Sequence, residues 1–272
     1  MLVYQSKNII KLPNCQEILL NENEDDNINL ISVKGGYIIY ILNFNKLIIK
    51  SANGIYSTFK EFEFNIKSIS VNLYNIITIA HENYILIFDL CLKQLDKIII
   101  NSFDTKPIIS YLNLNENTLS FFKNEELIFI DCKNKIIFSP LNIRFYNKII
   151  GWIGDEILLL KTNSKGVCLF NSKTYKIKQF CLCDVINSVF IYIDKIYLVV
   201  NINTIKVLDI NFIELNSFQI NQIGEINDVC VINPYELFFT SKNKLYYYNI
   251  STNFFSNIAE EKNNIDKLLS FN

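Results

Sequence analysis

Short apolar runs separated by polar turns occupy the whole chain. The runs are rich in Ile, Leu, Phe, Tyr and Val, as in YIIYIL from Tyr37 and YILIFDL from Tyr84. None is long enough or suitably periodic for a helix, whereas short apolar segments bounded by polar residues are typical of β-strands. The pattern therefore predicts an all-β protein.

These strands recur in units of about 40 residues. Each unit opens with an apolar residue, a polar pair and a short strand, followed by a turn and a second strand, as at Ile66, Tyr146, Ile186 and Ile226. A third strand ends in Ser, Asp or Asn, and a fourth strand follows. The third strands end at Ser51, Asp89, Asp131, Asn171, Asp209 and Asn249, at intervals of 38, 42, 40, 38 and 40 residues. Four strands in a unit of this length predict the blade of a β-propeller.

The two ends of the chain complement each other. KNIIKL from Lys7 precedes the similar KLIIKS by 39 residues, which predicts a third strand near the N-terminus, and Ile265 opens a unit 39 residues after Ile226. We therefore predict a seven-bladed β-propeller with four-stranded blades, the last blade joining a C-terminal first strand to N-terminal strands. This closure would remove open sheet edges. The blades are expected at 28–62, 63–103, 106–142, 145–182, 185–221 and 225–258, with a closing blade at 264–272 plus 1–21, all within one β-propeller domain, 1–272.

The blade period, the strand count and the Asp or Asn ending the third strand, in FDL, IDC, LDI and YNI, resemble the WD-repeat β-propeller superfamily over the whole chain. A typical WD repeat ends its third strand in Trp-Asp and carries Gly-His before its first strand. Here the single Trp152 lies elsewhere, His81 lies in a turn, and the sequence has no Gly-His pair. The chain thus resembles a degenerate WD-repeat-like propeller, and the resemblance implies an interaction platform.

Composition narrows the function classes. Half of the residues are hydrophobic, 19% are charged and the net charge is −1, which argues against disorder and against general nucleic-acid binding. With one His, nucleophilic triads and multi-His metal sites have almost no residues to use. No apolar run reaches the length of a membrane span, and we expect no secretory signal. Seven cysteines in or beside apolar runs fit a reducing cytoplasm or nucleus.

The seven glycines are few for so many hairpins. Asn is one of the commonest substitutes for glycine in the left-handed region. We expect Asn to take that role in the turns between second and third strands, at Asn43, Asn83, Asn124, Asn163, Asn203 and Asn243.

Several side chains allow both a functional interpretation and a simpler structural one. His81 is a candidate base or ligand, but no second His or carboxylate cluster accompanies it, which favours a solvated turn histidine. Cys181 and Cys183 form a CxC that lacks the second pair of a zinc site, which favours packing. The loop with Glu22, Glu24, Asp25 and Asp26 lacks the glycine of a calcium loop, so it is a solvated loop or a docking patch for a basic partner.

Arg144 is the only arginine, so the paired-arginine motif of phosphoinositide-binding propellers is missing. The segment Arg144–Lys148 is the one candidate for stacking on nucleic-acid bases, but an ordinary loop entering a strand is the simpler interpretation. Trp152 is either a binding hot spot or, more simply, a packing residue.

The innermost strands, such as ISV from Ile69 and VCV from Val229, offer little chemistry. We therefore expect no enzyme, no cofactor and no metal, but a non-catalytic scaffold of a larger cytoplasmic or nuclear complex. Its partners would be other proteins of a multisubunit assembly, with no membrane span and no direct contact with nucleic acid. The alternatives are a propeller enzyme with a channel-centred site, or a subunit stable only in its complex. The expected contact residues are Asp25, Asp26, Phe44, His81, Arg144 and Ile202.

Overall fold

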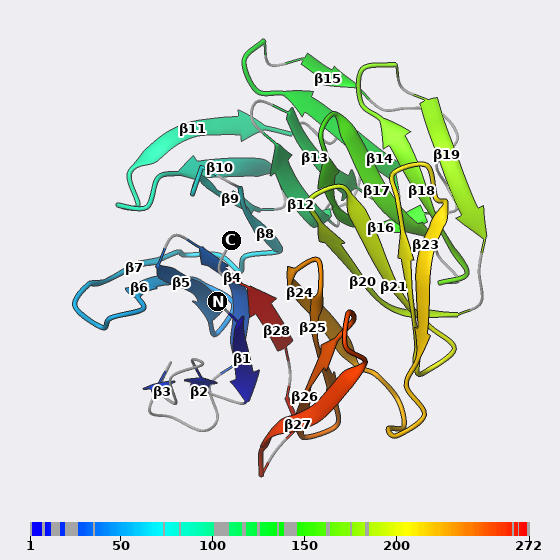
Figure 1. The fold of residues 1–272 in the computed structure, drawn as a ribbon. Coiled ribbons are helices and arrows are strands. Elements are labelled where there is room, and N and C mark those ends of the chain that lie inside the picture. The colour runs from blue at the N-terminus through cyan, green and yellow to red at the C-terminus, as the bar shows by residue number, and fades with distance from the viewer. Residues whose placement is uncertain are drawn as a thin grey trace. The chain divides into compact units, whose positions relative to one another are not determined.

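The described residues of the computed structural model are arranged in 28 strands (Figure 1). It describes residues 2–6, 9–11, 17–19, 27–34, 36–72, 74–81, 83–100, 109–115, 118–123, 126–134, 136–138, 146–161, 164–174, 176–182, 185–262, 264–265 and 267–270. Within these ranges, no helix is long and apolar enough to cross a membrane.

Six blades are each formed by four consecutive strands. Blade 1 contains β4 (Ile28–Lys34), β5 (Tyr37–Leu42), β6 (Lys46–Ser51) and β7 (Ser57–Glu61). Blade 2 contains β8 (Ser68–Val71), β9 (Ile77–Ala80), β10 (Tyr84–Phe88) and β11 (Gln94–Ile99). Blade 3 contains β12 (Ile109–Asn115), β13 (Thr118–Lys123), β14 (Glu126–Asp131) and β15 (Ile136–Phe138).

The remaining three blades follow the same order. Blade 4 contains β16 (Tyr146–Ile153), β17 (Glu156–Lys161), β18 (Gly166–Asn171) and β19 (Lys176–Leu182). Blade 5 contains β20 (Ile186–Tyr192), β21 (Lys195–Val200), β22 (Thr204–Leu208) and β23 (Glu214–Gln219). Blade 6 contains β24 (Asp228–Asn233), β25 (Glu236–Ser241), β26 (Lys244–Asn249) and β27 (Phe254–Glu260).

The ends of the chain form a further sheet, which we call the terminal sheet. Its strand order is β28 (Lys267–Ser270), β1 (Leu2–Ser6), β2 (Ile9–Lys11) and β3 (Glu17–Leu19). β28 pairs antiparallel with β1, from Leu2 opposite Ser270 to Gln5 opposite Lys267, and Figure 1 shows the two strands side by side. The C-terminal strand thus joins the N-terminal strands in the order expected from the sequence.

The predicted architecture needs a correction in its blade count. The all-β propeller class is confirmed, but the predicted count of seven blades is wrong. The structure has six blades of consecutive strands, and the chain ends add the terminal sheet, in which β2 and β3 have only three residues each. Strands this short offer few alternating positions for packing against a neighbouring sheet, so the repeat in the sequence overstates the similarity of this unit to the others.

The chain divides into two compact units. The first comprises Met1–Glu24, Asn163–Phe170 and Ile177–Asn272, and the second comprises Asp25–Thr162 and Asn171–Lys176. The expectation of one domain over 1–272 stays a prediction.

In each unit, the second and third strands of the blades carry the core. All four residues of β9 and the first five of β18 are buried, whereas β7 alternates between exposed and half-buried positions. In the second unit, blades 1 and 2 pack through a cluster that includes Ile39, Ile49 and Phe88. In the first unit, blades 5 and 6 pack in the same way through Val199 and Phe239. Burial on both faces explains the near-continuous apolar runs of these strands.

The first strands of blades 5 and 6 are tied together by a carboxylate. Asp228, at the start of β24, accepts a hydrogen bond from the Ser188 hydroxyl of β20 (3.0 Å) at Oδ1, and one from the Leu268 N–H of β28 (3.1 Å) at Oδ2. It therefore bridges blade 5, blade 6 and the terminal sheet. Ser188 and Asp228 both lie two residues after the isoleucine that opens their unit, so the bridge follows from the repeat.

Replacing Asp228 with alanine should destabilise the fold by about 2–3 kcal/mol, because hydrogen bonds to a charged, half-buried acceptor exceed the usual net value. Ser188→Ala is the matched control, since it removes one bond and should lower the free energy of unfolding by about 1 kcal/mol. Urea unfolding followed by circular dichroism measures both. Equal losses in the two variants would contradict the bridging role.

Candidate interaction surface

Each blade has two edges that carry turns. Because neighbouring strands run in opposite directions, the turns between first and second and between third and fourth strands share one edge. The turns between second and third strands share the other edge with the links to the next blade. Hydrogen bonds at the two edges follow two different repeating patterns.

At the second-to-third-strand turns, a backbone carbonyl accepts the N–H of the isoleucine that opens the next unit. The four pairs are Phe44 with Ile66 (2.7 Å), Ser164 with Ile186 (2.8 Å), Ile202 with Ile226 (2.8 Å) and Lys242 with Ile265 (3.1 Å). All four isoleucines are buried. We call this bond the latch, and we call the edge of a blade that carries such a turn and the following link the latch edge of that blade. The opening apolar residue of the sequence repeat is therefore the anchor of the latch.

All four latch carbonyls belong to residues with positive φ: 65° at Phe44, 55° at Ser164, 76° at Ile202 and 54° at Lys242. A β-branched or bulky residue in this region is strained, and such strain persists only where the surroundings fix the backbone. The latch is the contact that fixes it here.

The expected role of asparagine in these turns is confirmed at Asn43, whose φ is 50°, but it is wrong at Asn83, Asn203 and Asn243, which do not have positive φ. The side-chain amide of Asn203 instead donates to the Ile220 carbonyl (3.3 Å). The amides of Asn45 and Asn243 donate in the same way to the carbonyls of Phe62 and Glu261. Asn124 and Asn163 lie outside the described residues.

Two of the predicted contact residues project from this edge. The side chains of Phe44 and Ile202 are 54% and 55% exposed, although their backbones are held by latches. In the first unit, the exposed residue Val185 lies close to Ile202. The Val185 carbonyl accepts the N–H of Asn201 (3.2 Å), the residue directly before Ile202. The structure therefore leaves these apolar side chains available for contact.

His81 is packed in an aromatic cluster and is not the solvated turn histidine that its position suggested. Its ring stacks on Tyr84 and meets Phe64 edge-on, both with centroids 4.5 Å apart, and its Nδ1 accepts the Asn83 N–H (3.4 Å). The Lys97 ammonium lies 4.1 Å from the centroid of the Tyr84 ring. Burial, and next the charge of Glu63, raise the pKa of Tyr84.

The other predicted contact residues, Asp25, Asp26 and Arg144, lie outside the described residues, as do Glu22, Glu24 and Cys183. Asn27, which follows Asp26 directly, exchanges two hydrogen bonds with Asn43. The Asn43 N–H donates to the Asn27 carbonyl (2.8 Å), and the Asn27 N–H donates to Asn43 Oδ1 (3.0 Å). The chain that leaves the acidic loop is thus tied to the turn that carries Phe44.

Trp152 packs against Phe129 in an edge-on contact, with ring centroids 6.4 Å apart. Its indole N–H is buried and has no hydrogen-bond partner in the described part of the chain. Cys181 is half-buried in β19. Among the described residues, no three His, Cys, Asp or Glu side chains are grouped as a metal site requires.

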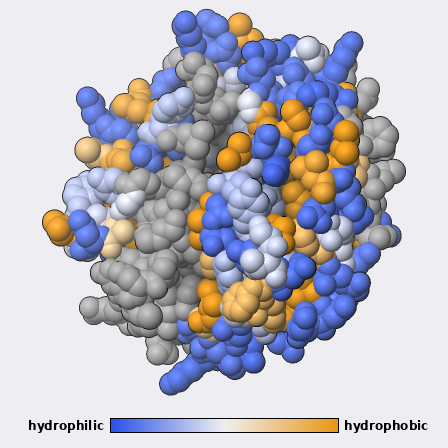
Figure 2. Space-filling model, viewed as in Figure 1, coloured by the Kyte–Doolittle hydropathy of each residue, from blue (hydrophilic) through white to orange (hydrophobic). Residues whose placement is uncertain are grey.

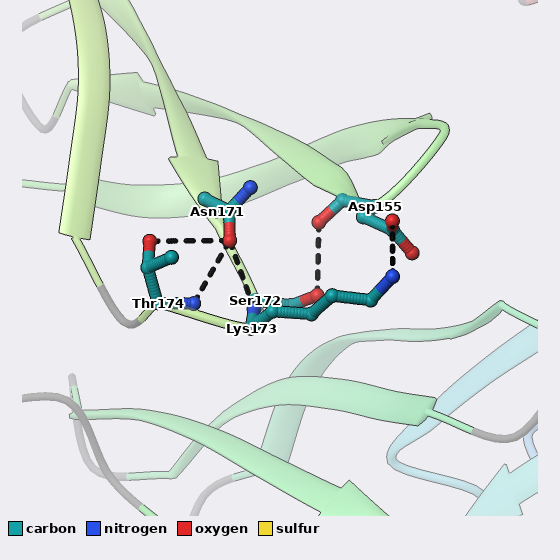
Figure 3. A network of polar contacts seen from close by, with 5 residues as sticks. All are labelled: Asp155, Asn171, Ser172, Lys173 and Thr174. Atoms are coloured by element: carbon teal, nitrogen blue, oxygen red, sulfur yellow. Dashed lines mark hydrogen bonds and ion pairs between the residues drawn. The ribbon is translucent and has the colours of Figure 1, made fainter.

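At the opposite edge, the residue that ends the third strand closes the turn that follows it. Asn171 Oδ1 accepts the N–H groups of Lys173 (3.0 Å) and Thr174 (2.9 Å), as Figure 3 shows. Asp89, Asp131, Asp209 and Asn249 accept turn N–H groups in the same way. Hydrogen bonds from the backbone of Ile213 and Asn211, partly opposed by desolvation, lower the pKa of Asp209. The Asp or Asn of the WD-like pattern therefore serves hairpin geometry.

A second set of backbone bonds joins the two turns of this edge within one blade. The N–H groups of Ala52, Ser172 and Ile250 donate to the carbonyls of Gly36 (2.7 Å), Asp155 (3.1 Å) and Tyr235 (2.8 Å). We call this bond the staple and this edge the staple edge. In blade 4 the exposed pair Lys173–Asp155 (2.6 Å) adds to the staple (Figure 3).

The staple edge carries exposed apolar residues that the sequence pattern had not singled out. In the space-filling view, apolar residues reach the surface in several places, separated by polar ones (Figure 2). The exposed apolar residues in staple-edge turns or beside them are Ile55, Tyr56, Tyr74, Ile193, Ile213, Tyr235 and Phe254. The signal was present in the sequence, because an apolar residue in a tight turn is the feature that marks Phe44 and Ile202.

No family model matches the sequence, and no curated protein matches it either. Solved structures are similar. A chain of the Mitotic Checkpoint Complex has a TM-score of 0.66 at 10% identity, over 87% of this chain and 78% of that chain. The Neurospora crassa Pan2 WD40 domain has a TM-score of 0.64 at 9% identity, over 86% and 79%.

The fold is that of a β-propeller and is similar to that of a WD40 domain. Virginiamycin B lyase from Staphylococcus aureus is also similar, with a TM-score of 0.64 at 15% identity over 86% of this chain and 85% of that chain. One architecture thus serves WD40 domains and a protein named as a lyase, so function has to be argued from particular residues.

Ile202→Asn should raise the free energy of unfolding by about 1 kcal/mol, because asparagine tolerates the left-handed region better than a β-branched residue. Val185→Asn is the matched control, since Val185 is similarly exposed but does not have positive φ. It should leave stability within about 0.5 kcal/mol of the wild type. A loss of stability in Ile202→Asn, measured by urea unfolding, would show that the side chain contributes to the fold.

The turn hydrogen bonds that Asp209 accepts should make the stability of the fold depend on pH. Its pKa is lower in the folded than in the unfolded chain, so its contribution is complete above the unfolded pKa of about 4 and is lost as pH falls through the folded pKa. Asp209→Asn keeps the acceptor but does not titrate. The difference in thermal midpoint between wild type and Asp209→Asn should therefore shrink from pH 7 to pH 3. Asn171→Asp should acquire the same dependence, and a constant difference would contradict the prediction.

Proposed function

We propose that the chain is a non-catalytic protein–protein interaction scaffold, a WD-repeat-like subunit of a larger complex in the cytoplasm or nucleus. Its contacts with other proteins lie at latch turns in each unit, with Phe44 of the second unit and Ile202 of the first as the apolar contacts. The further contact residues are His81, Arg144, Asp25 and Asp26.

The observation that carries this proposal is the combination of strain and exposure at the latch turns. Phe44 and Ile202 hold their latch carbonyls in the left-handed region, yet their side chains leave the sheets and reach solvent. Asn or Gly would fit these backbones at lower cost. Large apolar side chains fixed in rigid turns are instead suited to protein contacts, where a few well-packed residues carry most of the binding energy.

Two further observations support a scaffold. The similar structures include a chain of a multiprotein checkpoint complex and a WD40 domain. The carboxylate at the start of β24, which an enzyme with a channel-centred site could use, is occupied by the Ser188 hydroxyl and the Leu268 N–H. Asp228 is thus committed to holding blades together, while the lyase-named neighbour keeps an enzyme as the alternative.

The experiment compares proteins that co-purify with the tagged full chain from its source cell, quantified by mass spectrometry. The double variant Phe44→Ala with Ile202→Asn should lose at least about tenfold of its specific partners, because both apolar contacts are removed from an intact fold. Leu215→Ser, on the outer strand β23, is the matched control with a similarly exposed side chain. Retention of every partner by the double variant would overturn the proposal for this edge.

The acidic loop is tested separately by Asp25→Lys with Asp26→Lys. If the loop attracts a basic partner, reversing both charges should reduce capture of that partner and slow its association, and the effect should be largest at low salt. Unchanged capture at low salt would remove the acidic loop from the contact surface while leaving Phe44 and Ile202 to be judged by their own variant.

A further inference from the structure

The staple edge of blades 5 and 6 carries more exposed apolar side chains than their latch edge. Ile193, between β20 and β21, is 73% exposed, and Tyr235, between β24 and β25, is 60% exposed. Ile213 and Phe254 are exposed at the third-to-fourth-strand turns of the same blades. All four residues belong to the first compact unit.

Core packing and a backbone hydrogen bond hold the turns that carry these side chains. Blades 5 and 6 share one core, which includes Tyr197, Leu237 and Phe239 and against which Tyr192, next to Ile193, packs. The staple from the Ile250 N–H to the Tyr235 carbonyl (2.8 Å) holds the second turn. Turns between first and second strands lie at the same edge of each blade, so Ile193 and Tyr235 occupy corresponding positions in two blades that pack together.

Ile193 is also strained. Its φ of 56° places a β-branched residue in the left-handed region, at a turn position where Asn or Gly fits better. An exposed isoleucine at this position contributes nothing evident to the core, and it raises the energy of the turn. A contact with a partner would account for both facts.

The charge of this edge is one-sided. Its turns contain one lysine, Lys195, and four acidic residues, Asp194, Asp209, Glu214 and Glu236. These turns are residues 192–195, 208–214, 232–236 and 249–254. Lys206 of β22 pairs with Glu214 (3.0 Å), which leaves an excess of two negative charges. The latch edge of the same blades carries no net charge, because it contains three lysines and three glutamates at residues 200–203, 220–227, 241–244 and 260–262.

We propose that the staple edge of blades 5 and 6 is a second docking surface, and that its occupant is a basic, apolar segment of another protein. Lysine or arginine side chains of the segment face the acidic turns, and its aliphatic side chains cover Ile193 and Tyr235. This inference rests on the proposed role as a binding platform, but it concerns the opposite edge and a defined partner chemistry.

The test uses the full chain and a fluorescent synthetic peptide in which Lys and Leu alternate, with binding followed by anisotropy. Two matched peptides replace every Lys by Glu or every Leu by Ser. The Lys–Leu peptide should bind at least about tenfold more tightly than either matched peptide, and added salt should weaken it. Equal binding of the Lys–Ser peptide would reduce the effect to bulk charge and overturn the proposal.

Variants locate the site. Ile193→Asn with Tyr235→Ser should weaken binding of the Lys–Leu peptide at least about tenfold, and because both side chains are exposed, the variant should fold, which its urea unfolding curve checks. Phe44→Ala with Ile202→Asn, at the latch edge, should bind the peptide as the wild type does. Undiminished binding to the Ile193/Tyr235 variant, or no binding to the wild type, overturns this inference alone, since the latch-edge proposal is judged by partner capture.

Discussion

The backbone hydrogen bond from a blade-opening isoleucine to a turn carbonyl of the preceding unit is the interaction on which the repeat depends. It occurs four times in the described residues, always with a buried isoleucine as donor and a residue of positive φ as acceptor. Sheet packing alone is non-directional and tolerates sliding. A directional bond fixes where each new unit begins relative to the last turn of the previous one.

Because the latch uses only backbone atoms, it places no demand on the side chain of the turn residue. The four acceptors are accordingly dissimilar: Phe44, Ser164, Ile202 and Lys242. The staple at the opposite edge follows the same rule, with Gly36, Asp155 and Tyr235 as acceptors. Both edges therefore combine a fixed main chain with variable side chains, which is the arrangement that a family of binding surfaces on one fold requires.

The sequence predicted most of the architecture, because strand alternation and a regular period are local properties of the chain. The six blades of consecutive strands and the pairing of β28 with β1 follow the expected order. The predicted seventh blade is wrong, because the repeat in the sequence does not set the length of the short strands in the terminal sheet. Turn conformation was also beyond the pattern: positive φ was expected at Asn203, but its neighbours Asn201 and Ile202 adopt it. Part of the candidate surface could likewise be found from sequence, since apolar residues in polar turns correctly marked Phe44 and Ile202 as exposed.

Contacts between distant segments account for the rest of what the sequence did not reveal. His81 was misjudged because its neighbours Phe64 and Tyr84 come from two different segments of the repeat, and their contacts are set by packing between them. Asp228 gave no signal because its partners lie 40 residues away on either side.

The pairing of β28 with β1 has a further effect, on the order in which strands can pair during synthesis. Of the strands described, β1 is made first and β28 last, whereas blades 1 to 6 consist of consecutive strands and can form as they emerge. Until β28 has been synthesised, β1 is therefore an open edge, and a nascent chain at this stage is the one most exposed to pairing with the wrong strand.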